Sequence, residues 1–176
     1  MTIDKGQIGG IVGGVGIIML AMALAINNLS GDSAPETHTR CGWNEIEICS
    51  PLCQHEFFHH CSTTDSCHAR SSGIIFFISM LAALLSSLVA LLGVYIRLFN
   101  DKIKLHIRWM LLLSALCCIV AVTTWLALAT DSCYDPDWSH RYLGASAILP
   151  MIACLMFVVA AMLVWTQHKI GYETLL

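Results

Sequence analysis

The chain has 176 residues, of which 57% are hydrophobic and 12% are charged, and its formal net charge is −3. Soluble domains carry about 25% charged residues, so this composition excludes a water-soluble enzyme, a nucleic-acid-binding domain and a disordered protein. Half of the chain falls in four stretches without Asp, Glu, Lys or Arg: 8–26, 73–96, 109–130 and 143–165. Each stretch is long enough to cross about 30 Å of hydrocarbon as a helix. The sequence therefore predicts an all-α membrane protein, a bundle of four transmembrane helices in a single domain.

The charges outside these stretches predict how the chain sits in the membrane. We place the spans at about 8–26, 73–97, 109–130 and 143–166, with loops 27–72 and 131–142, a turn 98–108 and a tail 167–176. The region between the second and third spans and the two termini hold six of the nine Lys and Arg residues, whereas the two loops hold nine of the twelve acids. The positive-inside rule then places both termini in the cytosol and both loops outside the cell. We expect a multi-pass protein of the plasma membrane.

Aromatic residues agree with these boundaries. Trp109 and Trp165 lie near the predicted inner interface, and Trp125 lies near the outer one, where amphipathic rings are enriched.

The first span is rich in glycine. Gly9 and Gly13, like Gly10 and Gly14, are four residues apart, and this spacing lets a neighbouring helix approach closely. We interpret these four glycines as a helix-packing surface. Ala23-Leu24-Ala25 also fits a signal-peptidase site, so cleavage of the first span stays open as an alternative.

Cysteines dominate the outer loops. Three of the nine cysteines lie within spans, and the other six lie outside: Cys41, Cys49, Cys53, Cys61, Cys67 and Cys133. An even number in an oxidising compartment predicts three disulfides, with 15 connectivities left open. Because Cys133 is the only cysteine of the second loop, a bridge should join the two loops unless Cys133 pairs with another chain.

The first loop also contains a strand signal. Residues 45–48 alternate charged and apolar side chains, which is typical of a half-buried strand. We therefore expect a small disulfide-stapled extracellular cap with some β-strand. Trp43, Ile46 and Ile48 are its candidate contact residues.

We expect no catalytic residue, cofactor or metal site. The spans carry Ser and Thr but no ionisable side chain at mid-bilayer, which argues against a pump, an ion-selective pore or an intramembrane enzyme. The histidines of the first loop favour a solvated surface over a zinc site, because metal binding would compete with disulfide formation.

The tail carries two overlapping short motifs. Tyr172 and Leu175 fit a tyrosine-based sorting signal that clathrin adaptors bind as an extended strand, which would imply endosomal or lysosomal cycling. Thr174, Leu175 and Leu176 instead resemble a carboxyl-terminal ligand of PDZ domains.

The overall plan resembles the superfamily of claudins, peripheral myelin protein 22, epithelial membrane proteins and calcium-channel γ subunits. The segments 101–125 and 137–144 read like the family's third span and its approach to the fourth. The family signature is a tryptophan, then Gly-Leu-Trp, then two cysteines eight to ten residues apart. Trp43 could be its first tryptophan, no Gly-Leu-Trp follows, and Cys53 and Cys61 are the nearest cysteine pair. The resemblance implies a divergent member.

Two functional hypotheses follow. In the first, the chain is a non-enzymatic claudin-like protein whose stapled loops mediate cell–cell adhesion, junction or cell-recognition contacts, with membrane proteins in cis or in trans as partners and homo-oligomers among its assemblies. In the second, it is an auxiliary or trafficking subunit, and the glycine face of its first span packs on a channel or receptor in the same membrane. A net-anionic outer surface gives no reason to expect a nucleic-acid partner.

Overall fold

The computed structural model describes the backbone of residues 5–26, 28–33, 38–42, 45–50, 52–57, 64–95, 101–128 and 141–173. Side chains are described within 7–26, 28–29, 42, 70–95, 105–128 and 143–166.

Four helices in the described part of the chain are long and apolar enough to cross a membrane, which confirms the predicted spans. They are α1 (Lys5–Ile26), α2 (Thr64–Tyr95), α3 (Asp101–Leu128) and α4 (Ala145–Glu173). α2 and α3 begin before their apolar stretches, and α4 runs past its own into the predicted tail. Extending a formed helix costs little, because each added residue gains a backbone hydrogen bond.

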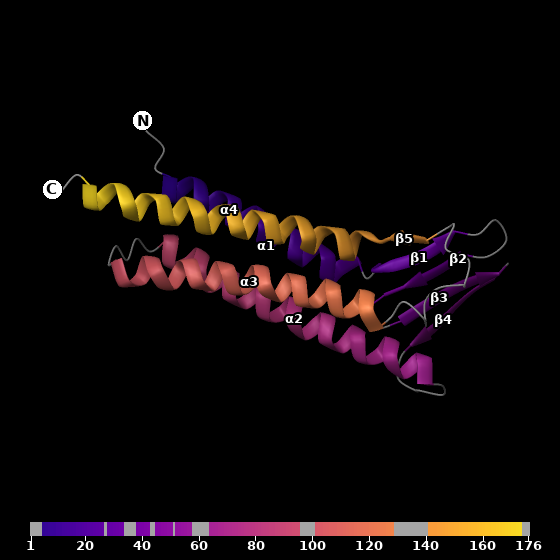
Figure 1. The fold of residues 1–176 in the computed structure, drawn as a ribbon. Coiled ribbons are helices and arrows are strands. Elements are labelled where there is room, and N and C mark those ends of the chain that lie inside the picture. Colours follow the sequence, from indigo (N-terminus) through magenta and orange to yellow (C-terminus); the bar gives the residue numbers. More distant parts are fainter. Residues whose placement is uncertain are drawn as a thin grey trace.

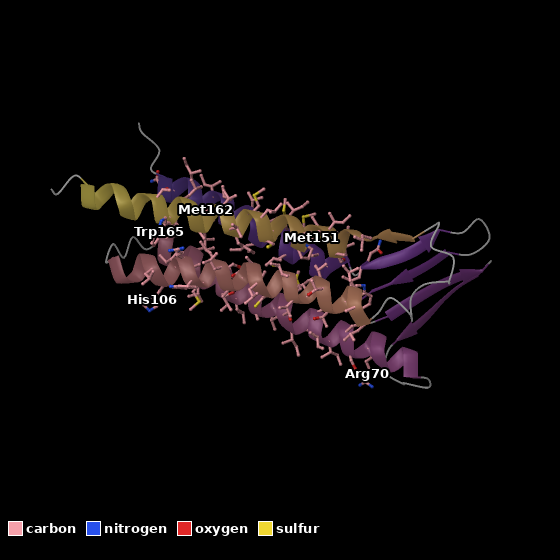
Figure 2. The ribbon with its side chains drawn as sticks, in the orientation of Figure 1. Arg70, His106, Met151, Met162 and Trp165 are labelled. Atoms are coloured by element: carbon pink, nitrogen blue, oxygen red, sulfur yellow. The ribbon has the colours of Figure 1, made fainter. Side chains whose placement is uncertain are left out.

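The helices form a closed bundle in which α1 packs mainly on α4, α2 on α3, and α3 on α4. Figure 1 shows that α1 begins and α4 ends at the same end of the bundle. α2 also ends there and α3 begins there, whereas the strands gather at the opposite end. The charged Arg70 lies near the strand end, and His106 and Trp165 lie near the other end (Figure 2).

The strands form one antiparallel sheet of five members in the order β4-β3-β2-β1-β5. The first loop supplies β1 (Ser30–Ser33), β2 (His38–Cys41), β3 (Glu45–Ser50) and β4 (Leu52–Phe57), and the second loop supplies β5 (Arg141–Leu143). β3 contains the alternating segment 45–48 that predicted a strand. Both loops therefore contribute to the same sheet.

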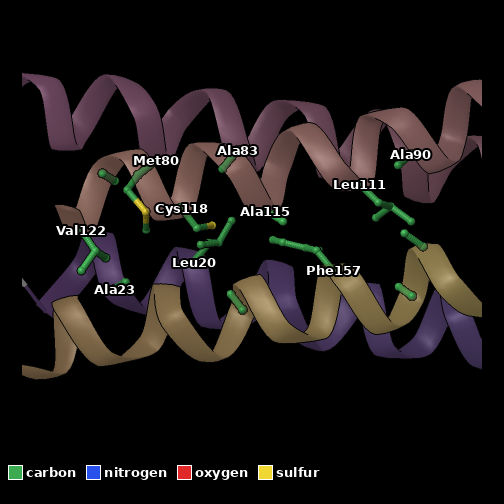
Figure 3. Packing of buried hydrophobic residues seen from close by; sticks show 14 of the residues in the cluster. Leu20, Ala23, Met80, Ala83, Ala90, Leu111, Ala115, Cys118, Val122 and Phe157 are labelled. Atoms are coloured by element: carbon green, nitrogen blue, oxygen red, sulfur yellow. The ribbon is translucent and has the colours of Figure 1, made fainter. Parts of the chain in front are cut away.

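Small side chains fill much of the bundle interior, and a few large ones pack between them. Ala83, Ala90, Ala115 and Ala160 are almost fully buried, so that the helix backbones can approach closely. Phe157 of α4 is fully buried and lies among these residues (Figure 3). Exposed large side chains, such as Met151 and Met162 of α4, cover the outside of the bundle, where lipid would contact them (Figure 2).

Trp125 packs inside the bundle. It lies near the strand end of α3, at the expected level, but its side chain is 1% exposed and belongs to the bundle core. A large ring can fill the bundle interior as well as the headgroup layer.

Candidate functional site

The five-stranded sheet is the candidate functional site, and hydrogen bonds fix it to two helices. β1 follows α1 after three residues, and β5 is separated from α4 by Gly144 alone. The Gly144 amide donates to the Leu29 carbonyl (2.9 Å), which continues the β1–β5 ladder toward the bundle. The sheet is thus a continuation of the α1–α4 pair.

Asn28 and Ser146 complete this junction. The Ser146 amide donates to the Asn28 carbonyl, and the Asn28 amide donates to Ser146 Oγ, both at 2.9 Å. The Gly144 carbonyl accepts from the amides of Ala147 (3.0 Å) and Ile148 (3.2 Å), so that Gly144 caps the start of α4. A Cβ on Gly144 would overlap the Asn28 backbone, and this close approach explains the glycine.

The register sorts the candidate contact residues onto the two faces of the sheet. Ile46 lies opposite Cys41 on β2 and Glu56 on β4, and Ile48 lies opposite Thr39 and Gln54. Because side chains alternate along a strand, Ile46 and Ile48 share one face, and Glu45 and Glu47 share the other. Trp43 lies outside the described residues.

The same register constrains three of the six outer cysteines. Cys49 and Cys53 are direct partners across the β3–β4 ladder, whereas Cys41, as the partner of Ile46, lies on the opposite face. Cys67 lies in the first turn of α2, and Cys61 and Cys133 lie outside the described residues. Disulfide formation stays a prediction, because the described cysteine side chains are the free thiols of Cys117, Cys118 and Cys154 in the spans.

The four glycines of α1 that were predicted to form a packing surface face different neighbours. A Cβ on Gly9 would meet the Ala160 carbonyl at 3.4 Å, and one on Gly13 would meet the Ala160 Cβ at 3.9 Å, so these two face α4 of the same chain. A Cβ on Gly10 would meet Val94 Cγ1 of α2 at 3.1 Å. Gly14 has open space around it, with no atom of the described residues within 4 Å of an added Cβ.

Sequence reasoning missed a closer glycine contact. A Cβ on Gly16 would lie 2.8 Å from Phe157 Cε1, so the ring of α4 occupies the space that this glycine leaves. Gly16 is outside the four-residue spacing of the other glycines, and the sequence contains no signal that pairs it with Phe157.

A hydroxyl pair in the membrane interior was also missed. Ser86 Oγ of α2 and Ser114 Oγ of α3 are 2.7 Å apart and buried. Each oxygen is also within hydrogen-bond distance of a carbonyl of its own helix, Ala82 (2.8 Å) for Ser86 and Met110 (2.9 Å) for Ser114. The expectation that span hydroxyls bond their own helix backbone is therefore met, but one pair also joins two helices.

At the end opposite the sheet, a cation–π contact joins α3 and α4. The Arg108 guanidinium carbon lies 3.9 Å from the centroid of the Trp165 ring and 6.0 Å from that of Trp109. Such contacts contribute about 0.5–2 kcal/mol, depending on how well they are shielded from water.

The tail motifs divide between described and undescribed residues. Tyr172 lies in the last turn of α4, which runs to Glu173, rather than in an extended segment. Thr174, Leu175 and Leu176 lie outside the described residues. An adaptor that binds Tyr172 as a strand would first have to unwind this turn.

No protein-family model matches the chain, and no curated protein is significantly similar to it.

Proposed function

We propose that the chain is a non-enzymatic, claudin-like four-span protein of the plasma membrane that makes adhesion, junction or cell-recognition contacts through its sheet. The observation that carries this proposal is the five-stranded sheet at one end of the bundle, to which both loops contribute. A sheet that continues two packed helices holds its outer surface in a fixed orientation, which lowers the entropy cost of binding a partner.

The bundle interior supports a structural role for the helices. The buried polar side chains among the described residues are five serines: Ser72, Ser86, Ser87, Ser114 and Ser146. Pathways for ions or protons use ionisable groups at mid-bilayer, and hydroxyls that bond helix backbones serve packing instead. This argues for a scaffold that carries the sheet.

Charge supports an extracellular sheet. The predicted loops hold nine of the twelve acids, and the opposite end holds six of the nine Lys and Arg residues. In that orientation the loop cysteines lie in an oxidising compartment, where disulfides would staple the sheet.

The apolar pair of β3 offers a direct test of the contact face. We expect that replacing both Ile46 and Ile48 by Ser lowers the clustering of non-adherent cells that express the protein severalfold. The matched control replaces Glu45 and Glu47, which lie on the other face of the same strand, by Ser. Surface biotinylation would verify equal delivery, and equal clustering by both double variants would argue against this face as the contact.

The alternative, an auxiliary subunit that packs on a channel or receptor, depends on the side of α1 that is left open. Gly9, Gly13 and Gly16 face α4 of the same chain, so substitutions there would disturb the fold rather than a partner. Gly14 has open space, and Gly14→Leu is therefore the variant that separates the hypotheses. Loss of a co-purified channel with clustering intact would favour the auxiliary role.

A further inference from the structure

A groove of about 710 Å³ lies between α1 and α2, at the end of the bundle opposite the sheet. Gln7, Gly10 and Ile11 of α1 line one side. Leu91, Leu92, Val94 and Tyr95 of α2 line the other. Of the described neighbouring helix pairs, these two contact each other least, since α1 packs on α4 and α2 on α3. The groove is thus a seam between two halves of the bundle.

The groove opens to the outside of the bundle within the membrane-spanning segments. Its rim residues Ile11 and Leu92 are 66% and 56% exposed, and Tyr95 at its mouth is 86% exposed. Both helices belong to apolar spans at this level, so in a membrane the groove would open toward the acyl chains of one leaflet. Its occupant is therefore apolar over most of its length.

The shape of the lining favours a flexible chain over a helix. Close helix–helix packing in membranes needs small residues along both contacting surfaces. Gly10 provides one such position, but the α2 side presents branched side chains, Leu91, Leu92 and Val94. The more open Gly14 is not part of the lining. A lipid acyl chain can follow this irregular surface, whereas a helix backbone cannot approach it closely.

The charge that this end of the chain carries in the sequence favours an anionic headgroup. Lys5 lies at the start of α1, two residues before Gln7, and Lys102 and Lys104 lie at the start of α3, beside the end of α2. Gly93 of α2 and Ile107 of α3 confirm this neighbourhood, since a Cβ on Gly93 would lie 3.0 Å from Ile107 Cδ1. In sequence, this end of the protein carries six Lys and Arg against three acids. An excess of cations at one end of a membrane protein complements a negatively charged lipid.

We propose that the groove between α1 and α2 binds one acyl chain of an anionic phospholipid, whose headgroup lies at the lysine-bearing ends of α1 and α3. The site does not depend on the sheet or on any adhesive partner. An experiment that refutes this lipid site would therefore leave the proposed adhesive function standing, and refuting the adhesive function would leave the lipid site standing.

Photo-crosslinking in nanodiscs tests the site with the full chain. The probes are phosphatidylserine and phosphatidylcholine with a diazirine in one acyl chain, and adducts are mapped by mass spectrometry. We expect the serine probe to label the segment 91–95 at least about fivefold more than the choline probe. The segment around Leu85, which is 56% exposed like Leu92 but outside the groove, reports unspecific contact with lipid.

Two variant pairs separate the acyl chain from the headgroup. Ile11→Trp fills the groove and should abolish the excess labelling of 91–95, whereas Ile18→Trp, at a site 61% exposed on the same helix, should not. Replacing Lys5, Lys102 and Lys104 by Gln should remove the preference for the serine probe and leave choline labelling unchanged. Arg70→Gln, at the opposite end of α2, is the control for charge.

Three results would overturn the proposal. The first is labelling of 91–95 no higher than that around Leu85, and the second is equal labelling by both probes. The third is a co-purified transmembrane helix that prevents lipid labelling of the groove and that Ile11→Trp displaces. This result would make the groove a protein interface.

Discussion

Individual glycines decide how closely α1 can approach α4. Gly16 and Gly14 are two residues apart on the same helix, yet a Cβ on Gly16 would clash with Phe157, whereas one on Gly14 would enter open space. Their spacing in the sequence does not reveal this difference, because helix-packing glycines and lipid-facing glycines look alike before the neighbouring helix is placed.

We expect Gly16→Leu to destabilise the bundle by about 1–3 kcal/mol, because overpacking forces Phe157 and the backbone to shift. Gly14→Leu should leave the stability within about 0.5 kcal/mol. Unfolding of the purified variants in detergent, measured by circular dichroism against temperature, checks both. Equal melting temperatures would contradict the packing of Gly16 on Phe157.

The Ser86–Ser114 pair is the second contact that acts at the scale of single residues. Replacing either serine by Ala leaves the other bonded to its own helix, at Met110 or Ala82, so each loss should be small. A double-mutant cycle should give a coupling of about 0.6 kcal/mol, typical of hydrogen bonds between helices in membranes. Zero coupling would mean that the two hydroxyls do not share a hydrogen bond.

At the scale of elements, the junction of α1, β1, β5 and α4 holds the sheet on the bundle. Ser146→Ala removes the acceptor of the part-buried Asn28 amide, and we expect a loss of about 1–3 kcal/mol from the unpaired donor. Gly144→Ala should cost at least as much, because its Cβ would overlap the Asn28 backbone. Hydrogen exchange should increase in β1 and β5 in both variants. Unchanged protection there would contradict the junction, and the Gly14→Leu variant is the control.

The β3–β4 hairpin makes a prediction about the disulfides. Paired residues in an antiparallel ladder have Cα atoms about 4.5–5.5 Å apart, which lies within the range that a disulfide spans. We therefore expect Cys49 and Cys53, which are ladder partners, to be bonded to each other. This would leave three connectivities for the other four outer cysteines.

Peptide mapping without reduction, on protein from intact cells, checks this pairing. A Cys49–Cys53 peptide and at least one peptide that joins Cys133 to the first loop are expected. A bond from Cys41 to Cys49 or Cys53 would contradict the register, which places Cys41 on the opposite face of the sheet.

The elements also show how far the sequence could predict the fold. Charge-free length was sufficient for the four spans, because the hydrocarbon thickness sets a minimum helix length. Alternation at 45–48 indicated β3, but the other strands lack such a pattern. β5 joins the sheet by pairing residues 141–143 with residues 30–32 of β1, which lie far away in the sequence. Long-range pairings of this kind, like the contact of Gly16 with Phe157, depend on tertiary neighbours, and no periodic pattern of residues in the sequence indicates them.

At the scale of the whole molecule, the proposed function assigns the two ends different roles. The sheet end would face other cells, and the lysine-rich end would face the cytosolic leaflet. The bundle between them is packed with small apolar residues, and the buried hydroxyls of Ser86, Ser87 and Ser114 bond to carbonyls of their own helices. This arrangement keeps the sheet at a fixed place relative to the membrane.

Crosslinking between two differently isotope-labelled cell populations tests whether the sheet contacts the surface of an apposed cell. One population expresses the tagged chain and the other represents the apposed cells. Affinity purification and mass spectrometry then assign each crosslinked partner to its cell of origin. We expect residues of the sheet to crosslink to surface proteins of the apposed cell, or to a second copy of the chain there. A stoichiometric channel or receptor from the same cell, crosslinked through α1, would contradict it.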